Sequence, residues 1–277
     1  MMLSGKTALI TGGSRGIGKA VASALAKEGA GLLLVSTSAT GIESAKQDLA
    51  KDGAKVETMA CDVSREQCVE DAVKLAKKVF GRIDILVNAA GIYGPIGRIS
   101  DIDPGEWRKT LEVNLTGTFL MTRAVLSVMQ EQRSGKIINF VGGGEGPYPR
   151  FSAYVASKGG VARFTETAAA EVKEFGIDIN AIAPGAVNTA FLDELLATGS
   201  EKVGEETYQR SIQQKKDGGV PPEKAAALCV FLASEKSNGL SGKILSAVWD
   251  QYEKFPEHLD EIMESDALTY RRVKPQV

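Results

Sequence analysis

The feature that most constrains the fold is an apolar run that ends in a glycine-rich turn and leads into a helical pattern. Residues 7–11 (TALIT) predict a buried strand, TGGSRGIG occupies 11–18, and apolar residues recur at helical spacing over 17–28. A strand, a glycine turn and a helix in this order begin a βαβ unit, with the helix N-terminus at the carboxyl end of the strand. The chain is therefore expected to build a parallel sheet.

The rest of the chain continues this alternation. Further apolar runs predict strands at 32–36, 56–60, 83–87, 136–141, 177–183 and 243–248. Helical patterns cover 42–51, 107–131 and 152–175; Pro222 opens another helix, and Ser64 is expected to cap one that runs to Phe80, with Gln67 completing a capping box. Strands that are apolar on consecutive residues are covered on both faces. The sequence predicts an α/β, Rossmann-type fold: a doubly wound, mostly parallel seven-stranded sheet in one domain over 1–248.

Histidine and cysteine are scarce, which excludes several kinds of site. His258 is the single histidine among 277 residues, so histidine-rich zinc sites are excluded and a Ser-His-Asp hydrolase is disfavoured. Cys61, Cys68 and Cys229 are odd in number and lack metal-ligand spacing. We expect no metal site and interpret the three as small buried residues in a reducing compartment.

Charge and hydropathy limit the partners. The formal net charge is −2 and there is no basic run, so neither nucleic acid nor an anionic membrane is expected as a partner. No window approaches the ~18 apolar residues of a membrane span. Residues 1–6 also lack the apolar region of a signal peptide. These features predict a soluble, cytoplasmic protein.

Two segments indicate a nucleotide site at the carboxyl edge of the sheet. Gly12, Gly16 and Gly18 lack side chains, so backbone N–H groups and the helix dipole can approach a pyrophosphate. Asn88-Ala-Ala-Gly91 follows the fourth strand at the same edge. Either segment alone could be an ordinary turn; the βαβ context favours binding.

A tyrosine and a lysine suggest proton transfer at this edge. Tyr154 and Lys158 are four residues apart, which places them on one face of the predicted helix. A phenol titrates near pH ~10, and an adjacent ammonium group favours the phenolate. A plain surface pair is the alternative, but the position after the fifth strand favours a catalytic role.

These residues together resemble the short-chain dehydrogenase/reductase family, from about residue 3 to residue 247. The resemblance rests on TGGSRGIG, Asp62-Val63, NAAG, Asn114, YVASK and Pro184-Gly185, which occur in the family's order. It implies a single-domain enzyme that transfers a hydride between a nicotinamide cofactor and a secondary alcohol or ketone. Relatives often form tetramers through the long helices after the fourth and fifth strands, so a homo-tetramer or homo-dimer is expected.

The resemblance also implies roles for individual residues. Tyr154 would be the general acid in reduction and the general base in oxidation, Lys158 would bind the nicotinamide ribose and lower the pKa of Tyr154, and Asn114 would hold a water in the proton relay. The residues expected at the cofactor, besides Tyr154 and Lys158, are Gly12, Ser14, Arg15, Gly16, Ile17, Gly18, Ser36, Thr37, Ser38, Asp62, Val63, Asn88, Ala89, Gly91, Pro184, Gly185, Val187 and Thr189.

The end of the second strand bears on which dinucleotide is used. An acidic residue there would bond the ribose of NAD(H) and repel a 2′-phosphate, whereas this chain has Ser36-Thr-Ser38. Arg15, in the glycine turn, could supply a positive charge to a phosphate, or could equally be a solvated surface residue. NADP(H) is therefore favoured over NAD(H).

The chain departs from the family at a serine that most relatives carry about thirteen residues before the tyrosine. Counting back from Tyr154 reaches Val141, or Gly142 with a one-residue gap, and neither side chain can donate a hydrogen bond. Such a donor typically contributes about 10²–10³ in rate. Backbone N–H groups at 142–144, or Tyr148, could replace it. The candidate substrate contacts are Gly142, Gly143 and Tyr148.

Three alternatives follow from this departure and from the fold. The protein could catalyse slowly or act on an unusual substrate, or it could bind a dinucleotide without turnover, in a structural or regulatory role. A Rossmann methyltransferase is the third, in which Tyr154 and Lys158 would have no function.

Two segments are expected to define the substrate. Residues 190–218 are polar and charged and lie where relatives carry a mobile lid. Residues 249–277 form a C-terminal extension with an apolar stripe at helical spacing, expected to pack on the same or a neighbouring subunit. The stripe consists of Leu259, Ile262, Met263 and Ala267.

Overall fold

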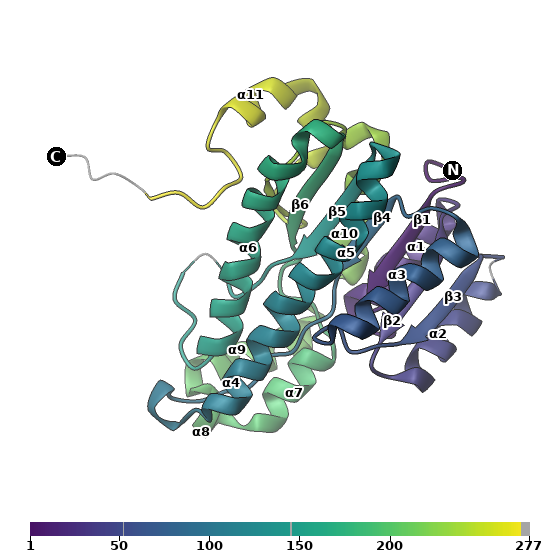
Figure 1. The fold of residues 1–277 in the computed structure, drawn as a ribbon. Helices are drawn as coiled ribbons and strands as arrows, with labels where there is room; N and C mark the ends of the chain where they lie inside the picture. Colours follow the sequence, from purple (N-terminus) through teal and green to yellow (C-terminus); the bar gives the residue numbers. More distant parts are fainter. Residues whose placement is uncertain (52, 145, 273–277) are drawn as a thin grey trace.

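A parallel sheet forms the centre of the molecule. The computed structural model describes residues 1–51, 53–144 and 146–272, and within these residues seven strands pair in the order β3-β2-β1-β4-β5-β6-β7, all parallel (Figure 1). The strands are β1 (Thr7–Thr11), β2 (Gly31–Ser36), β3 (Val56–Ala60), β4 (Ile85–Asn88), β5 (Gly135–Phe140), β6 (Ile177–Ala183) and β7 (Ile244–Ser246). The predicted fold class is confirmed, and the strand order reverses between β1 and β4, which opens a crevice at the carboxyl ends of these strands.

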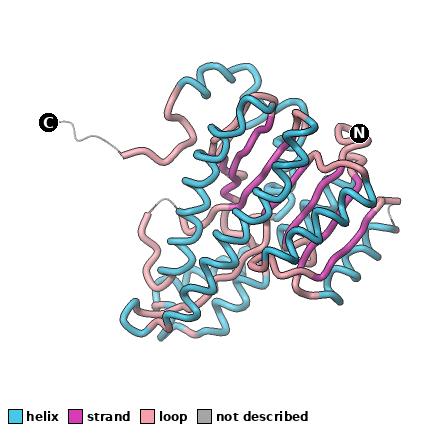
Figure 2. Tube along the Cα trace, in the orientation of Figure 1, coloured by secondary structure: helices cyan, strands magenta, loops and turns pink. Residues whose placement is uncertain are grey.

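Helices cover both faces of the sheet (Figure 2). One layer holds α1 (Gly16–Lys27), α2 (Ala39–Ala50) and α10 (Pro222–Ala233); the other holds α3 (Glu66–Phe80), α5 (Gly117–Gln132) and α6 (Ser152–Val172). Successive strand residues point to opposite faces, so Ile10 packs in the first layer and Leu9 in the second. Both are fully buried, which explains why the strands are apolar at every position.

A widened helical turn interrupts the helix predicted over 107–131. The chain runs from α4 (Pro104–Leu111) through a π-helical turn, Glu112–Thr116, into α5. Such turns are frequent at functional sites. Asn114 lies in this turn and is completely buried.

The predicted cap of α3 is wrong. The helix starts at Glu66, and neither Ser64 nor the N-cap residue makes a side-chain cap. Both the N–H and the hydroxyl of Ser64 donate instead to Asp62 Oδ1, at 3.0 and 2.7 Å, while Gln67 donates to Asp71 at 3.1 Å. A carboxylate is a stronger acceptor than a hydroxyl, so the loop is organised around Asp62.

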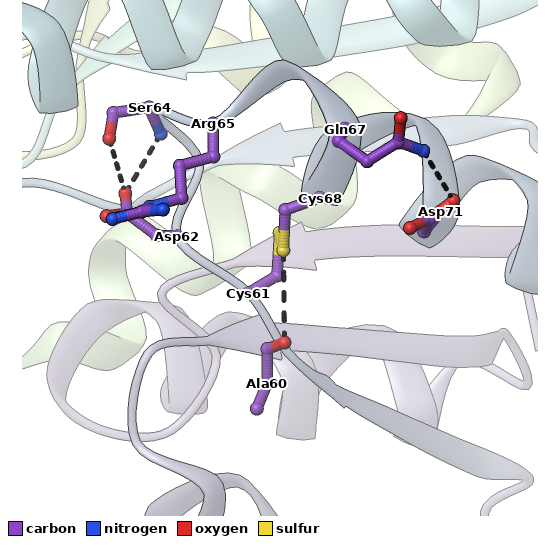
Figure 3. The surroundings of a disulfide bond; sticks show 8 residues. All are labelled: Ala60, Cys61, Asp62, Ser64, Arg65, Gln67, Cys68 and Asp71. Atoms are coloured by element: carbon purple, nitrogen blue, oxygen red, sulfur yellow. Dashed lines mark hydrogen bonds and ion pairs between the residues drawn. A yellow bond between two sulfur atoms is a disulfide. The ribbon is translucent and has the colours of Figure 1, made fainter.

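A disulfide joins this loop to α3 (Figure 3). Cys61, which follows β3, is bonded to Cys68 in the first turns of α3, and their Cα atoms are 5.6 Å apart. The interpretation of three reduced cysteines is wrong for this pair, because the loop returns the chain close enough for the two sulfurs to bond. Cys229 is free and buried.

The lid and the tail are largely helical. The predicted lid contains α7 (Ala190–Thr198), α8 (Ser200–Val203) and α9 (Glu205–Asp217). After a 3₁₀ segment, Tyr252–His258, the tail forms α11 (Leu259–Glu264), whose Ile262 is buried and whose Leu259 and Met263 pack against the core cluster of α1 and α10. The apolar stripe thus packs on its own chain, except that Ala267 is exposed.

Two further features concern membranes and metals. Among the described residues, no helix has both the length and the apolar character needed to cross a bilayer. In the same part of the chain, no three His, Cys, Asp or Glu side chains are grouped so that they could hold a metal ion.

Candidate active site

A long cleft runs along the carboxyl ends of the strands. Its volume is about 2010 Å³, which exceeds the usual 300–1,000 Å³ of a small-molecule pocket and leaves room for a dinucleotide and a second ligand. Of the site residues expected from the sequence, those that line the cleft are Gly12, Ser14, Arg15, Gly16, Ile17, Gly18, Ser36, Thr37, Ser38, Asp62, Val63, Ala89, Gly91, Gly142, Gly143, Tyr148, Tyr154, Lys158, Pro184, Gly185, Val187 and Thr189. Asn88 and Asn114 do not.

The glycine turn forms one end of the cleft. A Cβ on Gly12 would lie 2.8 Å from the carbonyl oxygen of Ala89, and one on Gly18 would collide with the carbonyl oxygen of Gly12. Larger residues would therefore push the turn away from β4. The N-cap of α1 is Arg15, which makes no side-chain cap, so the first N–H groups of the helix are left for a ligand. This cradle fits a pyrophosphate.

Polar side chains border the expected adenosine end. Ser36 Oγ and Ser14 Oγ are 3.0 Å apart, and Ser38 accepts a hydrogen bond from the N–H of Gly41 at 3.1 Å, capping α2. Arg15 pairs with Glu194 of α7 at 3.2 Å, and both side chains are at least half exposed. An exposed pair of this kind contributes little energy, so Arg15 remains open to a stronger anion.

Asn88 lies below the cleft instead of in its wall. It is buried, and its Nδ2 donates to Asn139 Oδ1 at 2.9 Å and to Thr122 Oγ1 at 3.3 Å. Asn139 in turn donates to Thr165 at 2.8 Å. In this structure the Asn88 side chain ties β4 to β5 and α5, and its expected contact with the cofactor stays a prediction.

Lys158 is buried beneath the middle of the cleft. Its Nζ donates to the carbonyl oxygen of Phe140 at 2.8 Å, at the end of β5. Burial lowers the pKa of Lys158 to about 8, because the charged ammonium loses its hydration.

Asn114 lies close to the same point. Its Nδ2 donates to the carbonyl oxygen of Ile92 and to Ser157 Oγ, and its Oδ1 accepts from the N–H of Ile92. A Cβ on Gly91 would lie 3.3 Å from Asn114 Oδ1 and 3.7 Å from Lys158 Nζ. The amide and the ammonium therefore both approach Gly91, as a shared proton relay would require.

Tyr154 projects from the first turn of α6 towards the end of β5. A Cβ on Gly142 would lie 2.5 Å from Tyr154 Oη. Burial raises the pKa of Tyr154 above its ordinary value, and the charge of Tyr148 raises it further. The expected lowering by Lys158 is not found in this structure, because both groups are withdrawn from water and the ammonium is directed at Phe140.

The position beside Tyr154 belongs to Gly142 and not to Val141. Val141 is buried and packs against Val161, Ala162 and Ala181. Gly142 lines the cleft and does not have a positive φ, so another residue could adopt its backbone conformation. The sequence analysis left Val141 and Gly142 as alternatives for this position, and Gly142 is the one that lies beside Tyr154 Oη.

An aromatic wall near Tyr154 was largely missed by the sequence analysis. The Tyr93 ring packs edge-on against Tyr154, with centroids 4.9 Å apart, and against Phe191 at 4.8 Å and Phe151 at 5.4 Å. Tyr148 stacks on Phe151 at 4.2 Å. The available signal was position: Tyr93 follows the NAAG segment by two residues.

Comparison with known proteins gives a consistent result. A family model described as short chain dehydrogenase matches residues 6–199. D-beta-hydroxybutyrate dehydrogenase of Cupriavidus necator is 35% identical over 255 residues, which are 90% of this chain and 97% of that protein. Levodione reductase of Leifsonia aquatica is 39% identical over 240 residues, 84% of this chain and 89% of the relative.

Solved structures agree in fold. The crystal structure of NAD+-bound xylitol dehydrogenase superposes with a TM-score of 0.82 and 29% identity, covering 89% of this chain and 98% of that one. A single-residue variant of actinorhodin polyketide ketoreductase, crystallised with NADPH, gives a TM-score of 0.81 and 29% identity, covering 89% of this chain and 96% of that one.

Proposed function

This chain belongs to the short-chain dehydrogenase/reductase family and is an oxidoreductase, and we propose that it interconverts a secondary alcohol and a ketone with Tyr154 as acid and base. One observation carries the proposal: Tyr154 Oη lies beside Gly142, Asn114 Oδ1 and Lys158 Nζ lie beside Gly91, and both glycines line the cleft that begins at the glycine turn. A proton donor and a cofactor cradle thus share one cavity.

In the proposed reaction, each of these residues would have a separate role. A bound nicotinamide supplies or accepts the hydride. Tyr154, kept neutral by burial, gives a proton to the carbonyl oxygen in reduction and takes it back in oxidation. Lys158 holds a hydroxyl of the cofactor ribose, and Asn114 supports the relay that returns the proton. The N–H groups that start α1 bind the pyrophosphate.

For the cofactor we propose NADP(H), although relatives bind either dinucleotide. The support is the chemistry at the end of β2, where Ser36, Thr37 and Ser38 line the cleft with no carboxylate among them, and Arg15 stands across from them. A 2′-phosphate would form a charge-assisted pair with Arg15. We expect this pair to be stronger than the exposed pair of Arg15 with Glu194.

The decisive experiment combines binding and turnover. NADPH, NADH and S-adenosylmethionine are titrated against the purified protein, and NADPH oxidation is then followed with cyclic diketones, 3-keto acids and aromatic ketones. We expect nicotinamide binding and carbonyl-dependent oxidation that Tyr154→Phe reduces by about 10²–10⁴. Binding without turnover by the parent on the whole panel would instead support a non-catalytic role, and S-adenosylmethionine binding would support a methyltransferase.

We further propose that residues 1–248 form the cofactor-binding and catalytic unit, that the protein acts in the cytoplasm as a homo-dimer or homo-tetramer, and that its ligands are small molecules. The assembly is supported by Phe119 of α5, which is exposed and lies beside Phe164 of α6, with ring centroids 6.2 Å apart.

In a reducing compartment the Cys61–Cys68 disulfide would be open to reduction.

A further inference from the structure

The proposed reaction lacks a side-chain hydrogen-bond donor at position 142, on the β5 side of the carbonyl oxygen. Gly142 stands where a side chain would touch Tyr154 Oη, and it has none to offer. Lys158 lines the cleft, but its ammonium group is directed at the Phe140 carbonyl. A single phenol would then have to stabilise the developing charge alone, which is a weak arrangement for a carbonyl reductase.

Tyr93 brings a second hydroxyl-bearing ring against Tyr154 in the cleft. It lies on the loop after β4, lines the cleft, and packs edge-on against Tyr154 at 4.9 Å between ring centroids. Phe191 and Phe151 hold the same ring from two other sides. A ring fixed by three aromatic neighbours keeps its hydroxyl in one place, which is what catalysis by orientation requires.

The Tyr93 hydroxyl is also chemically available. Within the described part of the chain, no residue makes a hydrogen bond with it, so its donor is free for a ligand. Burial raises the pKa of Tyr93, and the nearby charges of Tyr154, Tyr148 and Glu194 raise it further, so the phenol keeps its proton across the working pH range.

We infer that Tyr93 donates a second hydrogen bond to the substrate carbonyl oxygen beside Tyr154, replacing the hydroxyl that is absent at Gly142. The inference rests on the proposed ketone reduction. Tyr154 transfers its proton to the oxygen as the hydride reaches the carbonyl carbon, whereas Tyr93 keeps its proton and only stabilises the negative charge that develops on that oxygen.

The test compares Tyr93→Phe with Tyr208→Phe, the same substitution at a tyrosine that packs in this aromatic cluster without lining the cleft. Turnover is measured with NADPH and whichever panel ketone the unmodified protein reduces fastest. We expect Tyr93→Phe to lower kcat by about 30- to 300-fold, with the NADPH Kd and the melting temperature unchanged, and Tyr208→Phe to stay within threefold. A kcat within threefold for Tyr93→Phe, or an equal loss in Tyr208→Phe, overturns the inference.

A rescue variant tests whether the two hydroxyls share one task. Gly142→Ser adds a hydroxyl beside Tyr154, whose own hydroxyl has to shift because a Cβ at this position would lie 2.5 Å from it. Where Gly142→Ser alone keeps activity, it should recover at least tenfold of the kcat lost in Tyr93→Phe. If Gly142→Ser alone is active but the double variant is no faster than Tyr93→Phe, the inference fails. Rescue of Tyr148→Phe but not of Tyr93→Phe would assign the donor to Tyr148 instead. Absence of turnover by the unmodified protein is a separate result, which rejects the proposed function itself.

Discussion

The half-buried Lys136 and the fully buried Lys158 have opposite surroundings. Lys136 Nζ lies 2.6 Å from Asp178 Oδ2, and burial lowers its pKa while that carboxylate raises it. Lys158 has a backbone carbonyl as its hydrogen-bond acceptor, and burial alone lowers its pKa to about 8. An unpaired buried charge destabilises the fold, so Lys158 is retained at a cost to stability.

We therefore expect Lys158→Met to raise the free energy of unfolding by about 3 kcal/mol at pH 7, the equivalent of the shift from 10.5 to about 8. Because the folded pKa lies below the unfolded one, this penalty is complete below pH 8 and disappears as the pH rises towards 10.5. The difference in the free energy of unfolding between Lys158→Met and its parent, measured by urea unfolding, should therefore be smaller at pH 10 than at pH 7. Lys136→Met is the control, and it should lose about 1–3 kcal/mol because Asp178 is left unpaired. A Lys158→Met protein less stable than its parent at pH 7 would contradict this account.

The proposed preference for NADP(H) also depends on single residues. Arg15→Ala should weaken NADPH binding about tenfold, since a charge-assisted bond to phosphate contributes roughly 1.5–3 kcal/mol. NADH binding should change less than twofold. Fluorescence titration at fixed salt measures both, and Lys19→Ala, which removes a neighbouring charge already paired with Asp48, serves as the control. Equal losses for both dinucleotides would remove Arg15 from the phosphate site.

For single residues, the sequence predicted the positions that a motif with fixed spacing defines. The glycines of the turn, Tyr154 and Lys158 could be placed because motif spacing defines them. The side chain of Asn88 could not be placed, and Val141 and Gly142 were left as alternatives, because which strand-end side chain faces the cleft depends on register. Tyr93 was missed because its one sequence signal is that it follows NAAG by two residues, while its ring contacts come from two distant segments.

Among the elements, the segment between β3 and α3 is the most constrained. Asp62 bonds both groups of Ser64, and the disulfide ties Cys61 to Cys68. The sequence predicted the strand and the helix but not the bonds within the loop that joins them. A capping box of Ser64 and Gln67 and the carboxylate of Asp62 compete for the N–H of Ser64, and the carboxylate binds it. The π-helical turn at Asn114 was missed for a similar reason: helical periodicity continues through it.

Removing the disulfide should lower stability by about 2 kcal/mol, the value for a loop of this short length. Cys68→Ser tests this in urea unfolding. The unmodified protein should lose the same amount in dithiothreitol, while Cys68→Ser should not respond to the reductant. An unmodified protein whose stability is indifferent to dithiothreitol would contradict the prediction.

For the whole molecule, Phe119 of α5 is the exposed apolar residue best placed for assembly. It is 43% exposed and lies over α6 beside Phe164. Phe119→Asp should therefore convert the proposed oligomer to a monomer by light scattering, because a buried carboxylate at an interface is costly. Ile99→Asp, at a residue 81% exposed and elsewhere on the surface, should leave the mass unchanged. A monomeric parent protein would reject this assembly.

The sheet order has a consequence for how the chain reaches its native state. Ala8 in the central strand pairs with Ile85, and the next pairings join residue 136 to 85 and residue 244 to 181. Among the strands of the described residues there is no hairpin to nucleate the sheet, since parallel neighbours need a crossover. Contacts this remote in sequence make folding slow and leave apolar strands exposed meanwhile. Refolding from denaturant should therefore give yields that fall as protein concentration rises, and the nascent chain should depend on chaperones until its last strand leaves the ribosome.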